Sequence, residues 1–122
     1  MGYLRPTAII VGCWDSGRLG AAHDEALRIF GEAEMESLVS PIVSGIANGE
    51  QSFLIGWDGS KEGWEASDRA DAARAEFVAY LRSTAHEDGS FALDWVELQY
   101  GGDDRIVRAL AHDGEYLEAE VE

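Results

Sequence analysis

The sequence is poor in positive charge. It carries 9 Lys and Arg residues against 24 Asp and Glu residues, a formal net charge of −15 over 122 residues. Like charge at this density repels nucleic acid and anionic lipid, and it usually reflects solubility, a cationic partner, or both. We therefore expect no direct binding to nucleic acid and no membrane partner, and we expect any protein partner to be basic.

Cysteine and long apolar segments are also scarce. The single cysteine, Cys13, cannot form an intramolecular disulfide, and residues 3–6 interrupt any apolar stretch of the kind that a signal peptide needs. No apolar run approaches the roughly 20 residues that span a bilayer. These features predict a cytoplasmic protein in a reducing compartment, without a membrane anchor.

Hydrophobic residues, in contrast, are not lacking. They make up 46% of the chain, and aromatic residues 10%, which excludes the low-hydrophobicity signature of disorder. A chain of this length can bury a core without disulfides. Because no repeat or long linker divides it, we predict that residues 1–122 form a single domain.

The first half of the chain reads as strand, helix, helix, strand. Residues 7–14 form a β-branched apolar run that predicts a buried central strand, closed by a turn at 15–17. Apolar spacing of three to four residues predicts a helix over 21–30. Ser40–Pro41 matches an N-cap followed by proline at the first helical position, which predicts a short second helix before Asn48–Gly49. A second strand is expected over 52–57.

The second half reads as one helix and three strands. Ser67 can cap a helix whose apolar stripe includes Phe77 and Leu81, with Arg69, Arg74, Glu76 and Arg82 on its other side. Residues 91–100 then alternate with period two, but the parity changes, which predicts a bulge near Trp95 or a strand buried on both faces. Strands over 105–111 and 116–121 complete an antiparallel meander. We predict an α+β fold with helices packed on one face of a mostly antiparallel sheet.

The segment 56–65 is the most unusual stretch. It places two tryptophans, three carboxylates, one lysine and three glycines between a predicted strand and a predicted helix, where loops often carry function. Lys61 does not stand in a P-loop, because Glu62 follows it where Ser or Thr is required. A calcium loop that starts at Asp58 fails at its twelfth position, which is Arg69 instead of a bidentate Glu. We therefore predict no cofactor, no metal site and no catalytic site.

Two alternatives to these interpretations stay open. A non-standard metal site, or a small metal-dependent enzyme, would use Asp58, Glu62 and Glu65, with His23 as a further candidate. The histidines lack metal-ligand spacing from one another and from Cys13, which favours structural roles and an inert core thiol. The tryptophans of the segment are either core or lid residues, or contacts to a partner.

Carboxylates also recur near the end of the chain. Glu118, Glu120 and Glu122 alternate, so on one strand face they would stand roughly 6 to 7 Å apart. Such a row coarsely imitates the phosphate track of DNA, whereas the alternative is an edge strand that carries charge to deter aggregation. The residues predicted to bind a partner are Trp57, Asp58, Glu62, Trp64, Glu65, Asp103, Asp104, Glu118 and Glu120.

Residues 57–64, the helix that follows Ser67, and Asp94–Glu97 resemble a pattern in small uncharacterised proteins of bacteriophages, prophages and other mobile elements. The resemblance implies a context and transfers no functional residue. Small acidic proteins of this kind often block host machinery, and anti-CRISPR inhibitors are one group of them. We expect a non-enzymatic inhibitor, monomeric or dimeric, that acts in the host cytosol on a basic, nucleic-acid-handling complex. An immunity or antitoxin protein that neutralises a basic toxin is the alternative.

Overall fold

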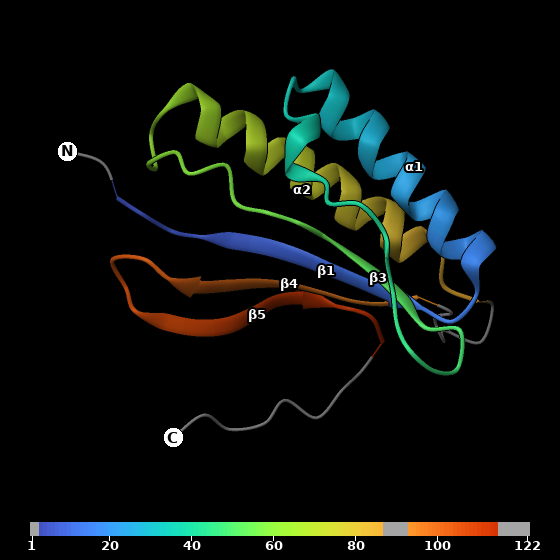
Figure 1. The fold of residues 1–122 in the computed structure, drawn as a ribbon. Helices are drawn as coiled ribbons and strands as arrows, with labels where there is room; N and C mark the ends of the chain where they lie inside the picture. The colour runs from blue at the N-terminus through green and yellow to red at the C-terminus, as the bar shows by residue number, and fades with distance from the viewer. Residues whose placement is uncertain (1–2, 87–92, 115–122) are drawn as a thin grey trace.

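The computed structural model describes residues 3–86 and 93–114. Its α+β class is confirmed, with two α-helices and a five-stranded antiparallel sheet (Figure 1). The elements, in chain order, are β1 (Thr7–Cys13), α1 (Ser16–Glu32), a 3-10 helix (Glu36–Leu38), β2 (Val43–Ser44), β3 (Gln51–Ile55), α2 (Glu65–Ser83), β4 (Asp94–Gly101) and β5 (Ile106–His112).

The sheet has the strand order β2-β3-β1-β4-β5, so β1 is central as the sequence predicts. Ile9 of β1 lies opposite Ile55 of β3 on one side and Glu97 of β4 on the other. The path from β1 to β4 is a βαββαβ arrangement of the split βαβ type, and β5 extends its edge. Helix α1 therefore leads to the edge strand β2, from which β3 returns beside β1, and helix α2 leads directly to β4 on the other side of β1.

The helices share one side of the sheet in Figure 1. Side chains alternate along β1, and Ile9 and Val11 are fully buried while Ile10 between them is 43% exposed. The buried side also receives Phe53 of β3, whose ring lies 6.4 Å from that of Phe77 in α2. The opposite face of the sheet has no helix over it among the described residues, so β1 is buried on one face only.

The first helix starts earlier than predicted, and the second predicted helix is absent. Asp15, predicted to lie in a turn, caps α1, because its Oδ1 accepts hydrogen bonds from the backbone N–H groups of Gly17 (3.0 Å) and Arg18 (3.2 Å). Ser40 does not begin a helix. It exchanges backbone and side-chain hydrogen bonds with Leu54, both of 2.9 Å, which hold the chain extended against β3.

Two further features differ from the sequence prediction, and one lies outside the described residues. Helix α2 begins at Glu65, so Ser67 lies buried inside its first turn and does not cap it. The bulge predicted near Trp95 is carried by the partner strand: its extra residue is Leu110 of β5, opposite the step from Glu97 to Leu98 in β4. The predicted strand over 116–121 lies outside the described residues, as do the first residues of the predicted strand over 91–100.

Gly102, in the turn between β4 and β5, permits a close approach of the N-terminal segment. Its φ is +67°, and a Cβ there would lie 2.4 Å from the carbonyl oxygen of Leu4 and 2.5 Å from Cδ of Pro6. Neighbouring Gly101 has a similar φ of +60°, but a Cβ there would meet nothing within 4 Å. Substitutions at the two positions therefore distinguish the cost of a left-handed backbone, which both share, from the cost of a steric clash, which only Gly102 has.

We predict that Gly102→Ala destabilises the fold clearly more than Gly101→Ala. Both variants place a side chain in the left-handed region, at a cost of about 1–2 kcal/mol, and only Gly102→Ala also displaces residues 4–6. Urea unfolding of the two variants and the parent would measure the difference. Equal losses of unfolding free energy would show that the contact between the turn and the N-terminal segment contributes nothing.

Candidate functional site

The N-terminal segment joins two of the regions predicted to bind a partner. Tyr3 accepts a hydrogen bond at its carbonyl oxygen from the backbone N–H of Glu62 (2.8 Å), and its hydroxyl donates to Oδ1 of Asp104. The backbone N–H of Leu4 donates to Oδ2 of Asp103 (2.8 Å). The loop before α2 and the β4–β5 turn therefore lie at the same end of the sheet, at the left in Figure 1. We call this region, residues 58–65 with Asp103 and Asp104, the acidic end.

The carboxylates of the acidic end fall into two groups. Those of Asp103 and Asp104 bind the N-terminal segment, and Oδ2 of Asp104 also accepts a hydrogen bond from Nε2 of Gln99 (3.3 Å). Asp58, Glu62 and Glu65 form no side-chain hydrogen bond or ion pair with a described residue. The first group positions the acidic end, and the second is free to meet a partner.

The two tryptophans of the loop differ in exposure. Trp57 is partly buried, whereas Trp64 occupies the N-cap position of α2 and is 54% exposed. The ammonium group of Lys61 lies 5.9 Å from the centre of the Trp64 ring. Trp64 is therefore not a buried core residue.

Trp64 also forms one wall of a hollow of about 390 Å³. Asp58 and Ser60 of the loop, Arg69 of α2, and Glu34 and Met35 of the segment after α1 contribute to it. The Ser60 hydroxyl and the Arg69 Nε are buried and have no hydrogen-bond partner among the described residues. The loop thus presents an aromatic wall beside polar groups that are not yet paired.

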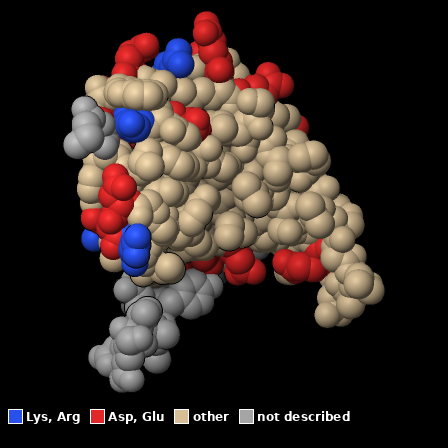
Figure 2. All heavy atoms as spheres, turned by 60° about the vertical axis from the view of Figure 1, so that its left-hand side comes forward, with Lys and Arg blue, Asp and Glu red and all other residues tan. Residues whose placement is uncertain are grey.

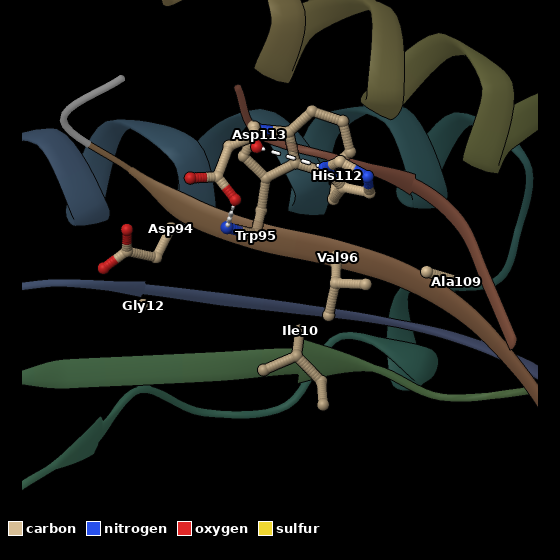
Figure 3. Close-up of a pocket in the computed structure, with 8 residues that line it drawn as sticks. All are labelled: Ile10, Gly12, Asp94, Trp95, Val96, Ala109, His112 and Asp113. Carbon is tan, nitrogen blue, oxygen red and sulfur yellow. Dashed lines mark hydrogen bonds between the residues drawn. The ribbon is translucent and has the colours of Figure 1, made fainter. Parts of the chain in front are cut away.

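The sequence does not indicate the open face of the sheet as a binding surface. Leu54, Ile10, Val96 and His112 lie opposite one another across four strands on this face. A hollow of about 450 Å³ lies there, lined mainly by apolar atoms (Figure 3). The sequence feature that bears on this face is the apolar run of β1. Such a run is typical of a buried strand, so it does not indicate that Ile10 is exposed.

The predicted roles of histidine and cysteine can be compared with the structure. His23 Nε2 lies 2.9 Å from the carbonyl oxygen of Ser40, and its ring meets Phe53 edge to face at 5.0 Å. These contacts give His23 a structural role in α1. Cys13 is buried in the core. Within residues 3–86 and 93–114, no three His, Cys, Asp or Glu side chains form a group that could hold a metal ion.

The charge is unevenly spread over the surface. On the face in Figure 2, Asp and Glu gather at the margins, and a broad central area carries no charged side chain. That face is therefore not a continuous acidic track. Glu118 and Glu120, on which the comparison with a phosphate track depends, lie outside the described residues.

Comparison with known proteins adds no assignment. No protein-family model, no curated protein and no solved structure matches the chain. In the part of the chain that the structure describes, neither helix has the length and apolar character needed to cross a membrane.

Asp94 borders the hollow in Figure 3 and has a perturbed carboxyl group. Partial burial raises its pKa above 3.8, and repulsion by the carboxylate of Asp113 raises the pKa further. Asp113 is held in place because its Oδ1 accepts a hydrogen bond from the backbone N–H of Trp95 (3.0 Å). Negative charge on Asp94 therefore opposes folding.

We predict that Asp94→Asn becomes more stable relative to the parent as pH rises. The folded pKa of Asp94 exceeds its unfolded value, so its contribution to stability is complete below pH 3.8 and is lost as pH rises through the folded pKa. The variant lacks this loss. Chemical unfolding of both proteins between about pH 3.5 and 7 would measure the difference between their unfolding free energies. The other carboxylates are present in both proteins, so their titration cancels in this difference. A constant difference in unfolding free energy would contradict the prediction.

Proposed function

We propose that the protein is a non-enzymatic acidic binding protein of the phage or mobile-element type, which inhibits a host defence complex by occupying a basic, nucleic-acid-binding surface. The observation that carries the proposal is the exposure of Trp64 within a loop whose three carboxylates are unpaired among the described residues. Tryptophan is enriched among the residues that dominate binding energy at interfaces. Unpaired carboxylates beside it suit a surface of Lys and Arg.

Two different contributions would act in such binding, one from the charge of the whole chain and one from the acidic end. The net charge of −15 attracts a basic partner over long range and accelerates encounter. The Trp64 ring and the adjoining hollow supply the short-range contact that holds the complex. Asp103 and Asp104 act indirectly, because their hydrogen bonds to the N-terminal segment fix the position of the loop.

A tagged pull-down from host lysate, eluted with a salt gradient, would identify the partner. The proposal expects a nucleic-acid-handling defence complex that elutes at moderate salt, because exposed charge pairs are screened by salt. A partner retained equally at low and high ionic strength would contradict the electrostatic basis. Recovery of a basic toxin would replace inhibition of a defence complex with immunity.

We predict that Trp64→Ala weakens binding to the recovered partner by about 30-fold or more, the loss expected for an interface hot spot of roughly 2 kcal/mol. Trp14→Ala is the matched control, since Trp14 is 69% exposed and follows the opposite end of β1. Surface plasmon resonance would measure both affinities. Equal losses in the two variants would exclude Trp64 as a specific contact.

A matched pair of charge-reversal variants tests the electrostatic contribution to association. Glu62→Lys and Asp24→Lys change the net charge equally, but Asp24 lies exposed on α1. We predict that Glu62→Lys slows association by about tenfold and flattens its salt dependence, and that Asp24→Lys has a smaller effect. Association rates that respond equally to both variants would show that net charge alone, and not the acidic end, directs binding.

A further inference from the structure

A polar cleft lies between α2 and the edge of the sheet, where an apolar core would be expected. Its volume is about 290 Å³. Thr7, Gln99 and Arg108 lie opposite one another on β1, β4 and β5 and form its floor, and Asp71 and Arg74 of α2 form its wall. Arg5, Glu62 and Glu97 complete the charged lining.

Arg74 faces the interior instead of solvent, contrary to its place on the polar side of the predicted helix. The residue is 5% exposed, forms an ion pair with Asp71, and has its Nε 3.9 Å from Oε2 of Glu97. Burial raises the pKa of Glu97 above 4.5, although the guanidinium of Arg74 acts in the opposite direction. Arg74 and Glu97 are thus largely withdrawn from solvent, whereas Arg5, Asp71 and Arg108 of the same cleft are exposed.

Two buried polar atoms of the cleft residues are left without partners among the described residues. Nη1 of Arg74 is a donor, and Oε1 of Gln99, in a residue only 1% exposed, is an acceptor. Buried polar groups are nearly always hydrogen-bonded, because an unsatisfied one destabilises the fold. One donor on the helix side and one acceptor on the sheet side are complementary to a molecule that both accepts and donates.

The charges of the cleft indicate the class of that molecule. Three of the nine basic residues of the chain line it, together with three carboxylates. A phosphate would meet repulsion from Glu62, Asp71 and Glu97, and a simple amine would meet repulsion from the three guanidinium groups. A molecule with both charges can pair with both sets, and carboxylate is a good acceptor for guanidinium.

We infer that this cleft binds a small zwitterion of the amino-acid type. Its carboxylate accepts hydrogen bonds from Nη1 of Arg74 and from Arg108, and its ammonium group donates to Oε1 of Gln99 and to Glu97. The cleft volume lies at the lower limit of ligand pockets, about 300 Å³, and so suits a single small metabolite. This site goes beyond the proposed partner binding and does not depend on it.

A thermal-shift screen of the full chain against the common amino acids tests the inference. Propionate, propylamine and inorganic phosphate serve as probes that carry one kind of charge. At about ten times its dissociation constant, a bound amino acid should raise the melting temperature by about 4–8 °C. No shift with any amino acid, or an equal shift with phosphate or propionate, would overturn the zwitterion assignment.

Two variants place the binding in this cleft. Gln99→Met removes the unpaired acceptor at similar volume, together with the Nε2 hydrogen bond to Asp104. The melting temperature of the unliganded variant therefore serves as its own baseline, and the ligand-induced shift above that baseline should be lost. Arg108→Met changes an exposed residue and should remove most of the shift, whereas Arg105→Met, in the adjacent turn and outside the lining, should retain it. A full ligand shift in both Gln99→Met and Arg108→Met would place the ligand elsewhere.

Discussion

The pairing of β1 on both of its edges is the constraint on which the rest of the structure depends. Thr7–Cys13 hydrogen-bonds to β3 and to β4, and its inward side chains form the centre of the core. Each neighbour is reached only after a helix has crossed the sheet, so β1 fixes where α1 and α2 lie. It also fixes the ends of the sheet, because the segment that enters β1 contacts the loop before α2 and the turn after β4.

Only one side of this arrangement is covered among the described residues. Helices α1 and α2 pack together, and Arg28 of α1 links Glu25 and Glu32 of its own helix to Glu76 of α2 (3.1 Å). The other face carries Ile10 and Leu54 in exposed positions. The molecule therefore has two surfaces of different character, an acidic end with an exposed tryptophan and an open apolar sheet face.

The parts of the fold that were predictable are those whose local pattern agrees with their long-range contacts. The apolar run of β1, the strand before Gly56 and the stripe of α2 all show this agreement. Ser40–Pro41 does not, because its helix-start signature is overridden by pairing with Leu54. The sequence favours a turn at Asp15, because glycine at 17 and 20 weakens the helical signal that follows it.

The candidate sites, like the fold, could be predicted from the sequence only in part. An unusual loop composition drew attention to Trp64 and its carboxylates, but only the structure shows that residues 3–4 join this loop to Asp103 and Asp104. Arg74 has the spacing of the buried stripe of α2, three residues before Phe77, and only its charge suggests a solvent-facing position. Gln99 has no distinguishing sequence context. Arg74 is accommodated at a buried position because the sheet that it faces holds Glu97, whose Oε2 lies 3.9 Å from its Nε.

The tether at the acidic end has a consequence for the order of folding. The hydrogen bond between Tyr3 and Asp104 joins residues 101 positions apart, and that between Leu4 and Asp103 spans 99. Contacts of such sequence separation close large loops and form late, after local structure has reduced the distance between their ends. During synthesis, residues 3–4 therefore wait for nearly the whole described chain to emerge, so the acidic end is completed among the last parts of the molecule.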